Sequence, residues 1–346
     1  MKNTIKIVFV IIASFVGAGF ASGKEIFIFF FQYGTMGKVG IIVSSGIISF
    51  IIYKVCIICI QNKIYSYNEF CRYLVNKNEF ARSLLNSLVN IFLLINFFIM
   101  VSGFASLFEQ EFNINQTVGI TVIIALNYFI SVKDIKGLVK ISNLLVPIFV
   151  VFLGIIVIQK FSYCNFDNCY NYNSVNVNLF NNWFVKSILY ASYNIIILIP
   201  VIIMLVKKIE KKKTSIIVSM VSFLLLTFLS FSIVMLLLMG DEKLFSLNMP
   251  IIGIISRYGK LYRLIYIFLI AISIFTTATS SCVSFLNNVD KKKEYFRKNL
   301  LIISIITFFI SKISFGNMVN CLYPVLGGVG LIEIVIILYK SYRNMN

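Results

Sequence analysis

The sequence contains no histidine, one tryptophan and four prolines among its 346 residues, and only 13% of these residues are charged. The absence of histidine excludes HExxH metalloproteases and enzymes that depend on a catalytic Ser/His pair. The four aspartates are scattered along the chain, so no paired-aspartate metal site is visible. A GxxxxGK[ST] phosphate loop is also absent, which argues against an ATP-driven pump. We therefore expect no enzyme and no cofactor, apart from the sodium ion considered below.

Hydrophobic residues make up 59% of the chain, and the mean hydropathy is +0.93. Apolar runs of ~20 residues recur from end to end, and each is long enough to cross a ~30 Å hydrocarbon core. The composition therefore predicts an all-α, polytopic membrane protein, with residues 1–346 forming one membrane domain in a lipid bilayer. The net charge of +18 would suggest nucleic acid as a partner of a soluble protein. Here the basic residues lie in short loops, so no nucleic-acid partner is expected.

Hydrophobic runs and turn signals predict ten membrane spans. Most Lys and Arg residues lie in the loops on the same side as the two termini, so the positive-inside rule predicts that both termini are cytoplasmic. The expected location is the cytoplasmic membrane of the cell. The predicted spans are 4–33, 37–62, 84–110, 116–132, 138–160, 183–206, 214–239, 261–286, 299–314 and 316–340.

The spans form two halves of five, residues 1–160 and 183–340, joined by an extracellular loop over 161–182. The offset between residues 37 and 214, where spans two and seven begin, also separates Pro147 from Pro324. Five spans per half insert the second half upside down, which is the inverted repeat of many secondary transporters.

The first span contains the stretch "ASFVGAGFASGKEIFIFFF", residues 13–31. The first span, 4–33, is too long for a straight crossing, and Gly17, Gly19 and Gly23 lie near its middle. The repeat offset carries residues 14–23 onto 191–200, "ASYNIIILIP", in span six. Discontinuous helices at matching positions in two halves mark the binding site of such transporters. We therefore expect helices one and six to be broken, although glycines in membrane helices also serve close packing.

The predicted solute site combines backbone from the first break with polar side chains from span six. Backbone N–H groups near Ser22–Glu25 would suit a substrate carboxylate, and carbonyls around Ala13–Gly17 would face a cation. Glu25 is an intramembrane carboxylate and so a functional candidate, as an amine ligand, a proton carrier or a helix cap. The predicted site residues are Gly17, Ala18, Gly19, Phe20, Ser22, Gly23, Glu25, Tyr190, Ser192, Tyr193 and Asn194.

At "FVGAGFASGKEI" the sequence resembles the YkvI-like bacterial membrane proteins, which are related to the amino acid–polyamine–cation superfamily. The resemblance extends over the whole chain through "LYASYN", "NMP", "IFTTA" and "YPVLGGVG". It implies the LeuT-type 5+5 fold. The family usually has glutamine before the glutamate, whereas this chain has Lys24.

The resemblance also implies a possible sodium site. In LeuT-type sodium transporters the helix corresponding to span eight supplies one carbonyl and two hydroxyls, and the broken first helix supplies further carbonyls. By resemblance, these ligands are Ala13, Ser273, Thr276 and Thr277. Such hydroxyls also bond commonly to their own helix, so sodium coupling, proton coupling and no coupling stay open.

Three further features carry smaller predictions. Glu333 and Lys54 lie near the cytoplasmic ends of their spans, where they pair with each other or extend to the interface. The segment "SLNMPIIGIISRYG", residues 246–259, predicts a short outer helix with Asn248 as its cap and Pro250 in its first turn. Cys164 and Cys169 are the only cysteines placed where a disulfide is plausible.

These features predict a secondary transporter of a small organic solute, an amino acid or related amine, working by alternating access. The alternative is a ligand-sensing membrane subunit on the same scaffold, similar to bacterial spore-germinant receptors. The sequence makes no prediction of oligomeric state.

Overall fold

The computed structural model describes residues 2–75, 78–133, 136–161, 182–209, 211–289 and 295–343. Within these ranges every regular secondary-structure element is a helix, and short turns and loops join the helices. Cys164 and Cys169, and almost all of the predicted connecting loop, lie outside the described residues. The first half contains α1 (Lys2–Phe15), α2 (Ala18–Ser22), α3 (Lys24–Phe29), the short η1 (Phe31–Tyr33), α4 (Gly34–Gln61), α5 (Tyr67–Val75), α6 (Glu79–Phe112), α7 (Gln116–Lys133) and α8 (Lys136–Phe161).

The second half of the chain is also helical. It contains α9 (Trp183–Ile209), α10 (Lys212–Leu237), α11 (Glu242–Phe245), α12 (Pro250–Ser256), α13 (Lys260–Val289), α14 (Phe296–Ile310) and α15 (Phe315–Arg343). In the described part of the chain, six helical segments are long and apolar enough to cross a membrane, and these are Lys24–Gln61, Glu79–Phe112, Trp183–Ile209, Lys212–Leu237, Lys260–Val289 and Phe315–Arg343. Shorter apolar helices cover Thr4–Phe15, Gln116–Val132 and Leu144–Lys160. A multi-pass membrane protein is confirmed, and the count of ten spans stays a prediction.

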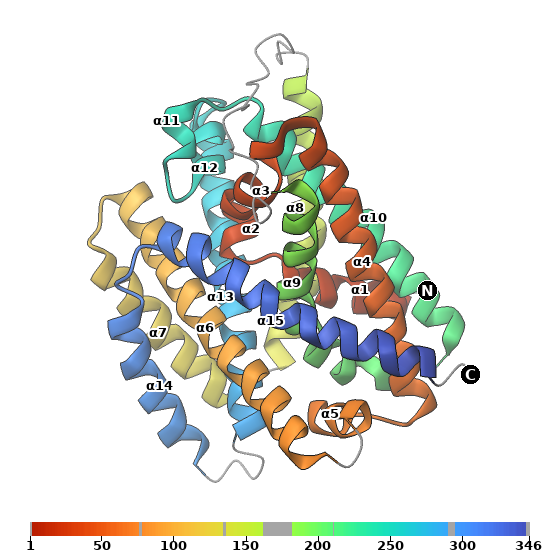
Figure 1. Ribbon diagram of the computed structural model, residues 1–346. Coiled ribbons are helices and arrows are strands. Elements are labelled where there is room, and N and C mark those ends of the chain that lie inside the picture. Colours follow the sequence, from red (N-terminus) through yellow and green to blue (C-terminus); the bar gives the residue numbers. More distant parts are fainter. Residues whose placement is uncertain are drawn as a thin grey trace.

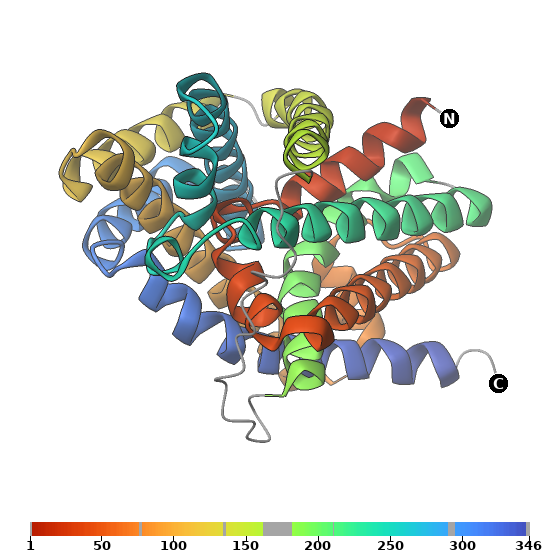
Figure 2. The same ribbon diagram turned by 90° about the horizontal axis from the view of Figure 1, so that it is seen from above.

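The helices form two groups around the N-terminal segment (Figure 2). One group contains α6, α7, α13 and α14, and the other contains α1, α4, α9, α10 and α15. Helix α9 packs closely against both α4 and α15. Gly327 and Gly330 of α15 allow this approach, because a Cβ at either position would meet the α9 backbone at 2.7 and 2.3 Å. Helix α2 contacts α6 and α13 of the first group, and α3 contacts α9, α10 and α15 of the second. The segment α2–α3 therefore lies where the two groups meet.

The short helices cover opposite ends of the long ones. In Figure 1, α11 and α12 lie at the upper left, and α5 lies at the lower right near the C-terminus. Pro250 begins α12, as predicted, but its N-cap is Met249 rather than Asn248. The Asn248 side chain instead accepts a hydrogen bond from the Gly316 N–H at 3.3 Å. Asp241 caps α11, and the Arg257 guanidinium beside it lowers the pKa of the Asp241 carboxyl.

The predicted break in span six is wrong, because α9 is continuous from Trp183 to Ile209. The polar residues that suggested a break bond to their own helix. Ser192 donates to the Ile188 carbonyl at 2.7 Å, and Asn194 donates to the Tyr190 carbonyl at 2.9 Å. Pro200 lacks an N–H group, but the helix passes through this position. A membrane helix tolerates such residues when each polar group finds a partner.

The predicted pairing of Glu333 with Lys54 is also wrong. Glu333 is buried and accepts a hydrogen bond from the Tyr67 hydroxyl of α5 at 2.9 Å. The Lys54 ammonium lies 5.4 Å from the centre of the Phe50 ring. Helix α5 therefore contacts α15 through a buried side-chain hydrogen bond.

Candidate functional site

The first span is broken at the predicted stretch. Helix α1 ends at Phe15, and Val16 and Gly17 are not helical. Helix α2 then runs for five residues to Gly23, whose φ of 82° ends it in the left-handed region. Helix α3 begins directly afterwards at Lys24. Gly23 is required here because the left-handed conformation is costly for residues that carry a Cβ.

Glu25 folds back from α3 onto α2. Its side chain is 4% exposed, and a Cβ on Gly19 would lie only 2.0 Å from its Oε1 atom. The absence of a side chain at Gly19 therefore makes the space in which the carboxylate lies. The Phe20 N–H is a further polar group facing this carboxylate. Glu25 therefore lies against the start of α2 rather than at an open helix surface.

Tyrosines enclose the other side of the Glu25 carboxylate. The Tyr193 hydroxyl of α9 donates to Oε2 at 2.5 Å, and the Tyr323 hydroxyl of α15 also bonds to the carboxylate. The Tyr193 and Tyr323 rings stack with their centres 4.6 Å apart. Tyr190 meets Tyr193 edge to face, with ring centres 5.4 Å apart. Helices from both halves of the chain therefore converge on one buried carboxylate.

The other polar residues predicted on span six do not face α2. The Ser192 and Asn194 side chains bond within α9, as described above. The Ser192 carbonyl lies against Gly330 of α15. Of the four predicted residues, Tyr190 and Tyr193 therefore belong to the site, and Ser192 and Asn194 belong to the packing of α9.

Hydroxyl groups of α13 satisfy the backbone carbonyls that the break exposes. Ser273 and Thr277 both donate to the Val16 carbonyl, the latter at 3.3 Å. Tyr266 donates to the Ala21 carbonyl at 2.7 Å. An unpaired carbonyl in a membrane interior costs several kcal/mol, so these contacts stabilise the broken segment.

The predicted sodium ligands lie around the end of α1. The Gly17 N–H donates to Phe15 at 2.9 Å, so the Ala13 carbonyl does not receive the bond that a continuous helix would supply. Ser273 and Thr277 converge on Val16, one turn further on. Thr276 donates instead to the Ser273 carbonyl at 3.0 Å. The hydroxyls of Ser273, Thr276 and Thr277 therefore all donate to backbone carbonyls in this structure, and the sodium site stays a prediction.

Three other predicted site residues, Ala18, Phe20 and Ser22, line the break, whereas the Lys24 side chain points away from it. The Ala18 N–H donates to the Met100 sulfur at 3.3 Å. The Ser22 hydroxyl donates to the Gly19 carbonyl and accepts from the Lys24 N–H. The Phe20 ring packs edge to face on Phe15. The Lys24 ammonium donates to the carbonyls of Phe245 and Leu247, at 3.0 and 3.2 Å, and so connects α3 to the end of α11.

Sequence reasoning missed Met100, Tyr266 and Tyr323, which contact the site from α6, α13 and α15. The motif "YPVLGGVG" contains Tyr323 next to Pro324, and this is the signal that could have pointed to it. Met100 and Tyr266 lie in ordinary apolar runs, and only packing brings them to the break.

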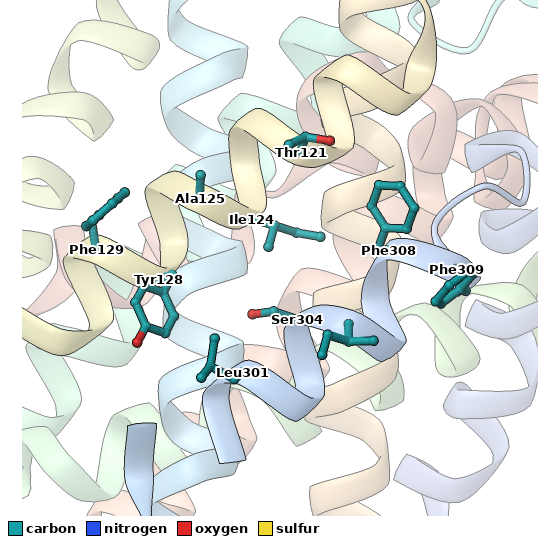
Figure 3. A pocket seen from close by; sticks show the side chains of 10 residues that line it. Thr121, Ile124, Ala125, Tyr128, Phe129, Leu301, Ser304, Phe308 and Phe309 are labelled. Carbon is teal, nitrogen blue, oxygen red and sulfur yellow. The ribbon is translucent and has the colours of Figure 1, made fainter. Parts of the chain in front are cut away.

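A separate cavity of about 600 Å³ lies between α7 and α14 (Figure 3). Figure 3 shows Ile124 of α7 and Phe308 of α14 beside the space between the two helices. Its lining is almost entirely apolar, and Phe129 and Phe309 are exposed. This cavity contains none of the predicted site residues.

The fold is shared with solved transporter structures. The chain superimposes with a TM-score of 0.62 on a mutant of the manganese transporter of Eremococcus coleocola, at 11% identity over 97% of this chain and 78% of that chain. A second structure from that organism is the manganese transporter in complex with an aromatic bis-isothiourea substituted compound. It gives a TM-score of 0.61 at 12% identity, with the same coverage. The chain is therefore a polytopic helical membrane protein with a broken first span, and its fold is shared with these structures.

A relative covers almost the whole sequence. The chain is 25% identical over 345 residues to the uncharacterized membrane protein YkvI of Bacillus subtilis (strain 168), covering 97% of this chain and 95% of the relative. The predicted resemblance to the YkvI-like membrane proteins is confirmed. No family model matches the chain.

Proposed function

We propose that this chain is a secondary transporter that carries a small organic solute, an amino acid or related amine, across the cytoplasmic membrane by alternating access. The main observation behind this proposal is that the buried carboxylate of Glu25 lies between a broken membrane helix and the tyrosines of α9 and α15. Intramembrane carboxylates are rare and generally functional. Helix breaks near the middle of a membrane are typical of transporter binding sites.

The proposal includes the topology predicted from the sequence. Ten spans form two inverted halves, 1–160 and 183–340, and both termini are cytoplasmic. Helices α11 and α12 then lie on the outer side, and α5 lies on the inner side. Alternating access moves one helix group against the other around the segment α2–α3.

An organic solute fits the site better than a metal ion. Manganese favours carboxylate, carbonyl and water ligands, whereas Glu25 is surrounded by aromatic rings. Among the residues that the structure describes, no group of three His, Cys, Asp or Glu side chains could hold a metal. The manganese cargo of the structural neighbours is therefore not proposed for this chain.

Coupling is proposed at one of two groups. Sodium would use the oxygens of Ala13, Ser273, Thr276 and Thr277, and a proton would use Glu25. Replacing external sodium with potassium separates the two, since only sodium coupling loses uptake under this exchange.

The test is uptake by the purified full-length protein in liposomes, with a panel of labelled amino acids and amines. Glu25→Gln keeps the size of the side chain and one acceptor oxygen, and it removes the charge. We expect uptake to fall at least about tenfold, because a buried charge that pairs with a ligand contributes more than ~1.4 kcal/mol. Glu333→Gln is the matched control, a buried glutamate that also bonds to a tyrosine. Binding without uptake would contradict the proposal and favour a sensor.

A further inference from the structure

The Glu25 carboxylate lies where a substrate carboxylate would be expected to bind. In a broken membrane helix, the N–H groups at the start of the second segment attract anionic groups of substrates. Here the Oε1 atom of Glu25 lies against Gly19, and the Phe20 N–H faces the same carboxylate. A second carboxylate at this position would meet a like charge in a buried site, which disfavours its binding.

Four neighbouring N–H groups of the break are also paired within the protein. Ala18 donates to Met100, and Lys24 donates to the Ser22 hydroxyl. The N–H groups of Gly17 and Gly23 donate to the carbonyls of Phe15 and Phe20. These donors are therefore not offered to an anion.

Lys24, which is adjacent to Glu25 in the chain, and Lys186 of α9 do not pair with Glu25. Lys24 extends to the carbonyls of Phe245 and Leu247. Lys186 of α9 lies over the Phe29 ring, 5.6 Å from its centre. The ion pairs among the described residues join Arg82 to Glu79, Arg257 to Asp241 and Arg263 to Glu111. No ion pair among the described residues therefore involves Glu25, and a cationic ligand would supply the missing opposite charge.

Aromatic rings complete the surroundings of this charge. Phe29 lies 5.3 and 5.7 Å from Tyr190 and Tyr193, between ring centres, and Tyr323 stacks on Tyr193. Ring faces attract ammonium groups, and aromatic cages recognise substituted amines. The Lys186 ammonium over Phe29 is an example within this cluster.

We infer that the Glu25 site takes an organic cation that lacks a carboxylate, that is, a simple amine or a quaternary ammonium compound, and not a zwitterionic amino acid. This inference rests on the proposed function, since it names the substrate class of the same site. Glu25 supplies the opposite charge, and the rings of Phe29, Tyr190, Tyr193 and Tyr323 supply apolar and cation–π contacts.

The test compares pairs of probes that differ only by a carboxylate. These are isoamylamine with leucine and phenylethylamine with phenylalanine, with choline as a quaternary probe. Binding is measured on the purified full-length protein by ligand-induced thermal stabilisation, because a ligand that binds only the folded state raises the melting temperature. We expect each amine to bind at least about tenfold more tightly than its amino acid. This comparison uses the unaltered protein and so does not depend on a variant that folds.

A variant then assigns the effect to Glu25. Glu25→Gln is expected to remove the preference for the amines, whereas Glu333→Gln is expected to keep it. The inference is overturned if the amino acids bind as well as the amines, if none of the probes binds, or if the preference survives in Glu25→Gln. Uptake in liposomes distinguishes a failure of this inference from a failure of the proposed transport function. Uptake of amino acids alone contradicts only the inference, and binding of amines without uptake contradicts only the transport function.

Discussion

At the scale of single residues, the site depends on the relation between Gly19 and Glu25. The sequence marks both, since glycine and glutamate are each unusual in the middle of an apolar span. It does not show that the carboxylate folds back over α2 and lies on the Cα of Gly19. Lys24, which follows Gly23, extends away to the carbonyls after α11. Adjacent residues on a helix point in different directions, and this explains why the two charges do not pair.

Gly19→Ala tests this relation directly. A Cβ at position 19 would lie 2.0 Å from the Glu25 carboxylate, so the carboxylate must leave its position. We expect liposome uptake to be lost while the protein still inserts and purifies as a folded chain. Gly46→Ala is the matched control, because a Cβ there meets nothing within 4 Å. Normal uptake by Gly19→Ala would show that the carboxylate position is unimportant.

At the scale of secondary-structure elements, α13 supports the broken segment and α9 closes it. Ser273 and Thr277 lie one helical turn apart on α13, and both donate to the Val16 carbonyl. By resemblance, the same hydroxyl pattern predicts sodium ligands. Hydroxyls of this kind also commonly donate hydrogen bonds to backbone carbonyls. The structure shows the second role, and the first stays a prediction. In α9, by contrast, the polar residues that suggested a break, Ser192 and Asn194, donate to carbonyls of their own helix, and the helix is continuous.

The double variant Ser273→Ala/Thr277→Ala removes both donors to Val16. A buried carbonyl left without a partner costs about 1–3 kcal/mol, so the melting temperature of the purified protein is expected to fall. Thr307→Ala is the control, because the buried Thr307 hydroxyl bonds only to the Ile303 carbonyl of its own helix. Equal melting temperatures for the double variant and the control would contradict a supporting role of α13.

At the scale of the whole molecule, short helices lie at opposite ends of the long ones. Helices α11 and α12 lie at one end and α5 at the other (Figure 1). The distribution of Lys and Arg predicts that the α5 end faces the cytoplasm. Helix α5 lies between two predicted spans, and its residues Tyr67, Phe70, Cys71 and Leu74 are buried. The amphipathic pattern of this helix is short, and its partner on α15 is distant in sequence.

The orientation is tested by single cysteines in a variant without the native cysteines. Cysteines replacing the exposed residues Glu242 and Ser256 are expected to react with a membrane-impermeant maleimide added to intact cells. A cysteine replacing the exposed Glu79 is expected to react only after the cells are opened. The reverse pattern of labelling would invert the predicted topology.

The sequence by itself determined the class of protein, the extent of the long helices and the position of the first break. These properties depend on local composition, because each apolar run must satisfy its backbone internally and glycine must supply the left-handed turn at Gly23. Only the tertiary structure decided which groups meet. Tyr323 and Tyr193 reach Glu25, Tyr67 reaches Glu333, and α13 pairs with Val16 through contacts between residues far apart in the chain. Such contacts depend on how helices pack against one another, and the pattern of one helix does not contain the shape of its neighbours.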